Sequence, residues 1–369
     1  MVNMKKASSK IKLAVNIVTF ILVGVVVYFA WPEIVTAWGL LGQVNIWILL
    51  LLIPVQIFSY FANDMIVFSY LRGRGQLHDL KLKMVARIAL ELNFVNHIVP
   101  SGGVSGMTYM IWRLRQLGIS AGQATVSQLV RLTTSLAVFI SLLAVSLFVV
   151  TAQNIAANWI IMFSTLGVTA VAGIILFGAY LIGNRRRMTK FARKLSWLSN
   201  KFVRKITLGR VQKDVIDPQR LKKFFIDIHG DYVVLKAQKK LLLKPLMWAV
   251  IFILAELSLF MVAFWALGAS FNFAVLVIAY GAASIIGSVI FTPGGTGGFE
   301  LMMITVLSAG GMMAADATAG VILARVILVL GTLASGYVVY HQAINRYGDP
   351  DIKKPRFKLS TFFQSRKGK

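Results

Sequence analysis

The chain has 369 residues, of which 57% are hydrophobic and only 14% are charged, and its mean hydropathy is +0.75. Soluble domains carry about one quarter charged residues, so this composition excludes a soluble enzyme and a secreted domain and predicts an integral membrane protein. The chain has no cysteine and only four scattered histidines. We therefore predict no disulfide, no metal site and no cofactor.

Seven apolar stretches are long enough for membrane-spanning helices, because each has about 19 residues or more and the hydrocarbon core is roughly 30 Å thick. In chain order they cover residues 13–31, 46–70, 123–150, 159–182, 245–267, 273–291 and 317–340. Two further apolar stretches, 88–112 and 299–313, adjoin prolines and glycines. We expect an all-α, polytopic membrane protein with a single transmembrane domain over residues 1–369, built from about seven spans and two re-entrant hairpins.

Lysines and arginines indicate on which side of the membrane each loop lies. Apart from Arg131 and Arg325, they fall in residues 1–12, 71–87, 113–115, 184–244 and 346–369. Basic loops stay in the cytoplasm, so we expect a multi-pass cell-membrane protein with both termini and the basic 184–244 loop inside. The net charge of +26 then faces anionic phospholipid headgroups and not nucleic acid. In residues 191–206, apolar residues recur every three or four positions between basic ones, which predicts an amphipathic helix on the membrane surface. Residues 346–369 are predicted to form a disordered basic tail.

This topology makes the two interrupted stretches re-entrant. Residues 88–112 would enter and leave on the cytoplasmic side, with a tip at Pro100, Gly102 and Gly103. The second hairpin would open outward, with a tip at Pro293, Gly294, Gly295, Gly297 and Gly298. Arg131 and Arg325 follow the two tips at nearly equal spacing. Similar elements of opposite orientation indicate an inverted repeat, which in transporters holds the substrate at mid-membrane.

Charged residues inside the apolar helices are the candidate site residues, because each costs about 2.5–3.5 kcal/mol at the bilayer centre. Arg131 and Arg325 suit a phosphate through paired hydrogen bonds. The helix N-termini that follow the glycine tips suit the same anion. Candidate partners of the arginines are Asp64, Glu91, Glu256 and Glu300. These acids would recognise a cationic headgroup or carry a coupling proton. A purely structural Arg–Glu pair is the alternative, and for Glu91 so is a local pair with Arg87.

Polar residues beside the first tip complete the predicted substrate site: Asn93, Asn96, His97 and Gly106. Asn93 and Asn96 are three residues apart and so share one face of a helix. The alternative for His97 is a hydrogen-bonded residue without a functional role, and for the glycines it is close packing of helices.

The sequence around both tips resembles a known family. The segment FVNHIVPSGGVSG (94–106), followed by Arg113, Gly118 and Arg131, resembles the first signature of the flippase-like transmembrane domain of lysylphosphatidylglycerol synthases. The segment PGGTGGFE (293–300), followed by Gly311, Ala317 and Arg325, resembles the second. The resemblance covers roughly residues 11–347. It implies movement of aminoacylated phosphatidylglycerol between leaflets, by a stand-alone member that lacks the aminoacyl-transferase domain.

We therefore expect a flippase or transporter of a phosphate-bearing lipid, namely aminoacyl-phosphatidylglycerol, a glycolipid or a polyprenyl-phosphate-linked lipid. A non-enzyme is favoured, because the resemblance does not extend to the aminoacyl-transferase domain and the basic loop shows no nucleophile–base pair, and no catalytic residue is predicted. The loop also has no nucleotide-binding motif, which argues against an ATP-driven pump. The alternatives are a membrane-embedded lipid-modifying transferase, a non-transporting scaffold for envelope glycosyltransferases and a small-solute transporter. Expected partners are membrane lipids and lipid-synthesising enzymes or glycosyltransferases. Headgroup, energy source and oligomeric state stay open.

Overall fold

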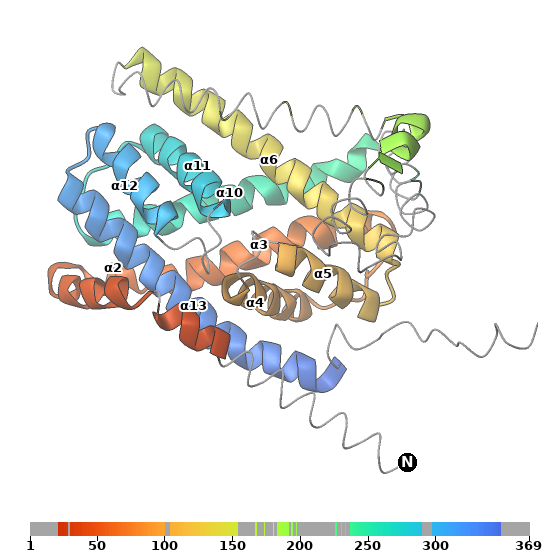
Figure 1. The fold of residues 1–369 in the computed structure, drawn as a ribbon, viewed down its shortest axis with the longest axis horizontal. Coiled ribbons are helices and arrows are strands. Elements are labelled where there is room, and N and C mark those ends of the chain that lie inside the picture. The colour runs from red at the N-terminus through yellow and green to blue at the C-terminus, as the bar shows by residue number, and fades with distance from the viewer. Residues whose placement is uncertain are drawn as a thin grey trace, which may run out of the picture.

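The computed structural model describes residues 21–28, 30–99, 104–153, 237–289 and 297–347, with further positions between 167 and 233. The described residues are predominantly helical (Figure 1), which confirms the all-α class. Three predicted features fall largely outside them: the span 159–182, the amphipathic helix 191–206 and the basic tail 346–369.

Eight helices form two consecutive sets of matching lengths. The first set is α3 (Leu52–Gly73, 22 residues), α4 (Leu82–Ile98, 17 residues), α5 (Val104–Gln116, 13 residues) and α6 (Ala121–Ala152, 32 residues). The second set is α10 (Leu243–Ala266, 24 residues), α11 (Phe273–Val289, 17 residues), α12 (Gly298–Ala309, 12 residues) and α13 (Ala314–Tyr347, 34 residues). In each set a long helix is followed by two short helices and then by the longest one. This repetition of lengths agrees with a repeat of the chain; the opposite orientation of the two halves stays a prediction. Short elements precede the two sets: η1 (Leu41–Gln43) and α2 (Ile46–Leu49) before α3, and η2 (Lys239–Leu242) before α10.

The turns of the two sets match as well. At the end of α5, Gly118 has φ +86° and donates to the Arg115 carbonyl at 3.1 Å. At the end of α12, Gly311 has φ +97° and donates to the Ser308 carbonyl at 3.1 Å. In both turns the next residue donates five positions back, so each turn is a Schellman motif. A left-handed backbone costs other residues about 1–2 kcal/mol, which explains why glycine stands at both positions.

Four helices are long and apolar enough to cross a membrane: Ile46–Gly73, Ala121–Ala152, Lys239–Ala266 and Ala314–Ile344. A fifth is counted if the segments Ile21–Tyr28 and Ala30–Leu40 form one bent span. The expected count of seven is therefore not confirmed by the described residues. The predicted span 273–291 appears as α11, which is described through Val289, and its last two residues lie outside the described part of the chain. An apolar run cannot by itself distinguish a crossing helix from one arm of a helix pair.

The two sets are interleaved. Helices α3 and α10 pack against each other more extensively than any other pair, and Figure 1 shows α6 and α13 on opposite sides of them. One helix of each short pair packs on the longest helix of the other set, since α4 contacts α13 and α11 contacts α6. Side chains on α4 and α11 can therefore meet residues from both halves of the chain.

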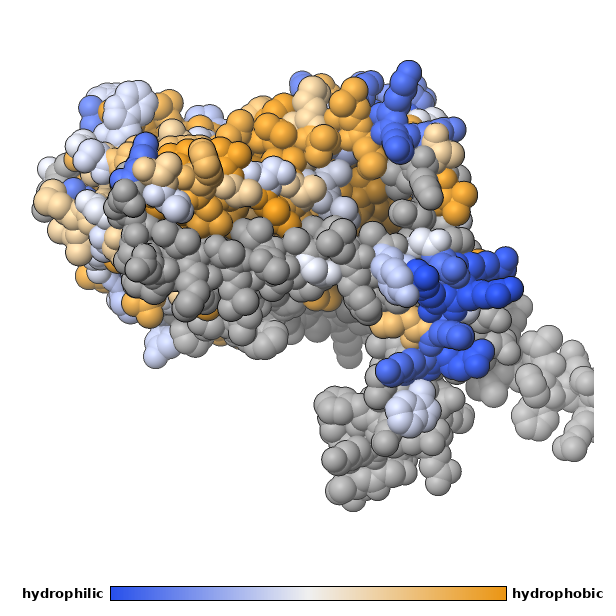
Figure 2. Space-filling model, turned by 90° about the horizontal axis from the view of Figure 1, so that it is seen from above, coloured by the Kyte–Doolittle hydropathy of each residue, from blue (hydrophilic) through white to orange (hydrophobic). Residues whose placement is uncertain are grey.

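The surface divides into an apolar region and a basic end. Large apolar side chains are widely exposed, among them Trp38, Trp47 and Phe148, and orange apolar residues cover much of the face in Figure 2. Blue hydrophilic residues gather at one end of the molecule in Figure 2. Arg185, Arg186 and Arg187 are exposed in the helix that begins at residue 185. A broad apolar surface with charges gathered at an end is typical of a protein that sits in a lipid bilayer.

Candidate functional site

An ion pair joins Glu300, in the first turn of α12, to Arg325 in α13. The Arg325 Nε lies 2.5 Å from Glu300 Oε1, and the two side chains are only 11% and 7% exposed. The other carboxylate oxygen, Oε2, accepts a hydrogen bond from the Gly297 N–H at 2.6 Å. The guanidinium also lies over the Phe299 ring, 4.6 Å from its centroid. Glu300 thus already occupies donors at the N-terminus of α12 that we expected to bind a phosphate.

Arg325 also interacts electrostatically with titratable residues from both halves of the chain. It acts electrostatically on His97 in α4, on Glu256 in α10 and on Glu33 in the segment Ala30–Leu40. Sequence patterns predicted His97 and Glu256 as site residues but not Glu33. Glu33 could have been identified from the sequence, because it is an acidic residue in a region that contains no lysine or arginine.

Glu256 is fully hydrogen-bonded at the centre of the bundle. Its Oε1 accepts a short hydrogen bond from the Ser59 hydroxyl of α3, and its Oε2 accepts one from the Tyr280 hydroxyl of α11 at 3.1 Å. One carboxylate therefore connects α3, α10 and α11. Because a partly buried acid is stable when such donors satisfy it, this arrangement supports a structural role for Glu256.

A second network connects α3 to α13. The Gln56 amide donates to the Leu328 carbonyl at 2.6 Å and to the Thr332 hydroxyl at 2.8 Å. The hydroxyls of Tyr60 and Thr332 lie 2.6 Å apart. All these groups are buried. Sequence patterns did not reveal this network, because the partners are more than 270 residues apart along the chain.

At the first tip, Asn96 makes a contact similar to that of Glu300. Its Oδ1 accepts a hydrogen bond from the Gly106 N–H in the first turn of α5, at 2.9 Å. A side chain at Gly106 would collide with the Asn96 amide. Asn93 and His97 instead bond within α4, Asn93 to the Ala89 carbonyl and His97 to the Asn93 carbonyl. Of these three polar residues, Asn96 is thus the one whose side chain bonds across from α4 to α5 in the described structure.

Several predicted tip residues cannot be assigned a geometry. Pro100, Gly102, Gly103, Pro293, Gly294 and Gly295 lie outside the described residues. The ends of the flanking helices are described: α4 ends at Ile98 and α5 begins at Val104. Gly298 begins α12 directly after Gly297, whose φ is +91°. Both breaks therefore fall where the prolines and glycines predicted them.

Glu91 forms the local pair with Arg87 that was one of the predicted alternatives, and it has a second partner, Arg113, that was not predicted. Its carboxylate accepts hydrogen bonds from the Arg113 Nε at 2.9 Å and from the Tyr109 hydroxyl at 3.0 Å, both from α5. Arg87 reaches its other oxygen at 3.4 Å. Glu91 and Arg113 are both fully buried. Arg113, which the sequence places at the end of the first hairpin, lies in the last turn of α5, and the packing of α5 on α4 buries it.

Asp64 in α3 and Arg131 in α6 differ from the pairs above, because neither side chain has a hydrogen bond or ion pair in the described structure. Asp64 is fully buried, and neither of its carboxylate oxygens has a hydrogen-bond partner among the described residues. Arg131 acts on it electrostatically without a direct ion pair between the two described side chains. Gln128 and Ser135 lie on the same face of α6 as Arg131, and their buried side-chain polar atoms also lack partners within the described structure.

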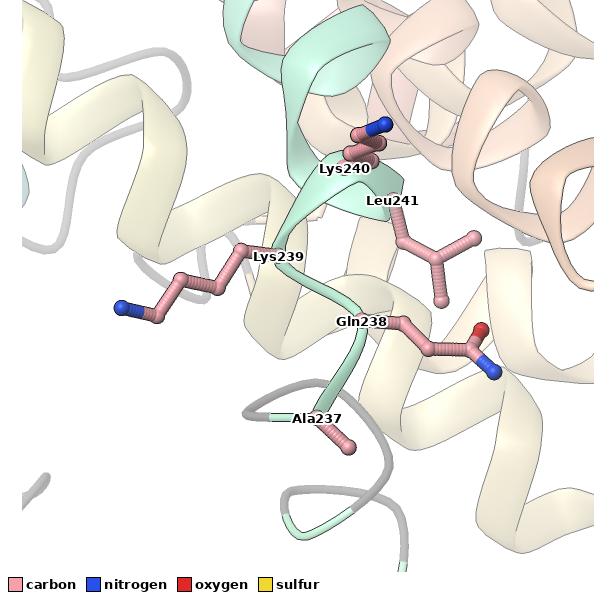
Figure 3. A pocket seen from close by; sticks show the side chains of 5 residues that line it. All are labelled: Ala237, Gln238, Lys239, Lys240 and Leu241. Carbon is pink, nitrogen blue, oxygen red and sulfur yellow. The ribbon is translucent and has the colours of Figure 1, made fainter.

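Two surface hollows lie away from these residues. One, of about 620 Å³, is lined by Ala237–Leu241, where the chain enters α10. Figure 3 shows Lys239 and Gln238 pointing to opposite sides of this segment, so its polar groups do not converge. The other, of about 390 Å³, lies between the end of α6 and the residues Phe271–Ala274. Neither contains a predicted site residue.

The long apolar helices and the charged residues buried between them define a multi-pass α-helical membrane protein with a polar interior. The family model described as the lysylphosphatidylglycerol synthase TM region matches residues 13–336, and the chain belongs to this family. No curated protein sequence matches the chain. The resemblance noted around the two glycine tips is thereby confirmed.

Proposed function

We propose that this protein moves a phosphate-bearing lipid between the leaflets of the cell membrane, with both termini in the cytoplasm. The observation that carries the proposal is the pair Arg131 and Arg325, which stand at nearly the same place in the equivalent helices α6 and α13. Arginines within apolar helices face a cavity or a partner. The family matched by the chain supports the same function.

Arg131 and Arg325 differ in the partners that a bound phosphate would have to replace. The Arg131 side chain makes no hydrogen bond or ion pair with a described residue, so its planar fork of donors is available for two phosphate oxygens. Arg325 is paired with Glu300. A phosphate oxygen carries the same charge as the carboxylate, so the headgroup would take the place of Glu300 at Arg325 and at the Gly297 N–H.

The remaining assignments follow from this function. The substrate would be aminoacyl-phosphatidylglycerol, a glycolipid or a polyprenyl-phosphate-linked lipid, all of which carry a phosphate between an apolar tail and a polar head. The basic end would face anionic headgroups. Lipid-synthesising enzymes or glycosyltransferases would supply or consume the lipid.

Reconstitution tests the proposal directly. Purified protein is placed in phosphatidylcholine vesicles that contain a trace of fluorescent lipid, and dithionite quenching reports how fast the label changes leaflet. The panel comprises labelled phosphatidylglycerol, a labelled polyprenyl phosphate and a labelled ceramide without phosphate. We expect movement of at least one phosphate-bearing lipid and none of the ceramide. Hydrogen bonds to charged groups contribute about 1.5–3 kcal/mol, so Arg131→Ala and Arg325→Ala should each slow movement roughly 10- to 150-fold.

Two control variants sharpen the result. Arg186→Ala removes an exposed arginine at the basic end and should leave the rate unchanged. Arg131→Lys keeps the charge but loses the fork of donors, so its rate should fall between wild type and Arg131→Ala. Unchanged rates in both folded alanine variants would refute the site. No movement of any lipid by folded wild type would refute the function and favour a scaffold.

A further inference from the structure

The two halves treat equivalent acids differently. Asp64 in α3 and Glu256 in α10 stand at nearly the same place in matching helices. Both oxygens of Glu256 accept hydrogen bonds, from Ser59 and Tyr280. Neither oxygen of Asp64 has a described partner, although its residue is fully buried. The repeat therefore keeps an acid at this position and leaves one of the two without donors.

An ionised carboxylate in such a place is costly, because burial removes water and no donor replaces it. It is stable in two forms: with a proton bound, or in contact with a cation. The nearby cation is Arg131, which acts on Asp64 from α6 without forming a direct pair. Gln128 and Ser135 add buried polar atoms without described partners, which is the kind of lining that an internal water requires.

The other charged side chains discussed around α3 are already held by hydrogen bonds or ion pairs with their own partners. On α4, Glu91 also acts on Asp64, but it is bonded to Arg113 and Arg87. On α10, Glu256 is bonded to Ser59 and Tyr280. On α13, Arg325 is paired with Glu300. Asp64 and Arg131 are thus the two facing charges that no described hydrogen bond or ion pair holds.

We propose that Asp64 is a proton-binding site that couples lipid movement to the proton gradient. The inference rests on the proposed function, because it requires Arg131 to exchange partners. Without lipid, Arg131 pairs with the Asp64 carboxylate. When the lipid phosphate takes the guanidinium, Asp64 binds one proton from water on that side. When the lipid leaves on the other side, the proton is released there and the Arg131–Asp64 pair forms again.

This exchange keeps the buried site neutral at each stage. The arginine cation is balanced first by the carboxylate and then by the phosphate, while the proton neutralises Asp64. A net charge at mid-membrane is avoided, which matters because each uncompensated charge is costly there.

Infrared titration tests the proton site without any transport. A protonated carboxyl group gives a carbonyl stretch that a carboxylate lacks. In lipid nanodiscs the wild type should show such a band that disappears as the pH is raised, and Asp64→Asn should lack it. Asp79→Asn, which removes an exposed acid between α3 and α4, should keep the band. Absence of a band specific to Asp64 would overturn the proposal.

Transport under an imposed pH gradient tests the coupling. With one proton per lipid, a gradient of one pH unit should shift the equilibrium distribution of labelled phosphatidylglycerol between leaflets about tenfold. Asp79→Asn should keep this shift. Asp64→Asn should lose it, even where lipid still equilibrates between leaflets. A shift retained in Asp64→Asn would overturn the coupling. If the wild type moves no lipid, the proposed function fails, and the infrared titration alone decides whether Asp64 is a proton site.

Discussion

Removing Glu91 should destabilise the protein more than removing any surface charge. Its carboxylate accepts hydrogen bonds from Arg113 at 2.9 Å and Tyr109 at 3.0 Å, and Glu91 and Arg113 are both fully buried. Glu91→Ala leaves the Arg113 guanidinium buried without its carboxylate. Loss of one partner of a buried ion pair costs about 3–5 kcal/mol, which is roughly two to four orders of magnitude in the folding equilibrium. The contact with Arg87 at 3.4 Å adds little, because that side chain is 31% exposed.

A double variant separates the pair from its environment. Replacing both charges, as Glu91→Leu with Arg113→Met, removes the uncompensated charge, and such replacements are often neutral. The double variant should therefore be several kcal/mol more stable than Glu91→Ala, with a favourable coupling between the two sites. Unfolding in mixed dodecylmaltoside and sodium dodecyl sulfate micelles, followed by tryptophan fluorescence, measures both. A loss below about 1 kcal/mol for Glu91→Ala, as found for exposed pairs, would refute the reasoning.

Two further predictions concern glycines, and both use the same unfolding measurement. Gly118→Ala and Gly311→Ala should each cost about 1–2 kcal/mol, because both residues are left-handed and no atom lies near either Cβ position; equal stability to wild type would show that the turns relax freely. Gly106→Ala should cost about 1–3 kcal/mol by displacing the amide that accepts its N–H. In an Asn96→Ala background, Gly106→Ala should cost much less, because the amide with which the new side chain collides is gone. If the losses of the two single variants simply add in the double variant, the clash is not the cause of the loss.

The local features of the fold were predictable from the sequence. Prolines and glycines cannot continue a helix without cost, so the end of α4 and the beginning of α12 lie where the two motifs predicted them. The glycines at 118 and 311 were noted as matching positions, and both prove to be left-handed helix ends. These effects depend on a few neighbouring residues, which is why sequence alone was sufficient.

Span counting was less successful for a physical reason. Hydropathy measures whether a segment prefers an apolar environment, and lipid and a protein interior satisfy that preference equally. Helix α11 is apolar throughout, and its described residues pack against α12 and α6. The same uncertainty applies to charges: Arg113 looked like a loop residue because its position next to Arg115 follows the pattern of a cytoplasmic boundary.

By itself, the sequence determined that this is an all-α membrane protein of the lysylphosphatidylglycerol synthase transmembrane family, with two interrupted helix pairs and arginines at 131 and 325. Only the tertiary structure decided which charges meet. Glu91 pairs with Arg113, Glu300 with Arg325, and Asp64 with no described hydrogen-bond partner. Composition and helix breaks arise from local chain properties, whereas ion pairing depends on packing between helices that are distant in the chain. The sequence does not show whether a buried carboxylate has hydrogen-bond donors beside it. That depends on which helices surround it in the folded protein.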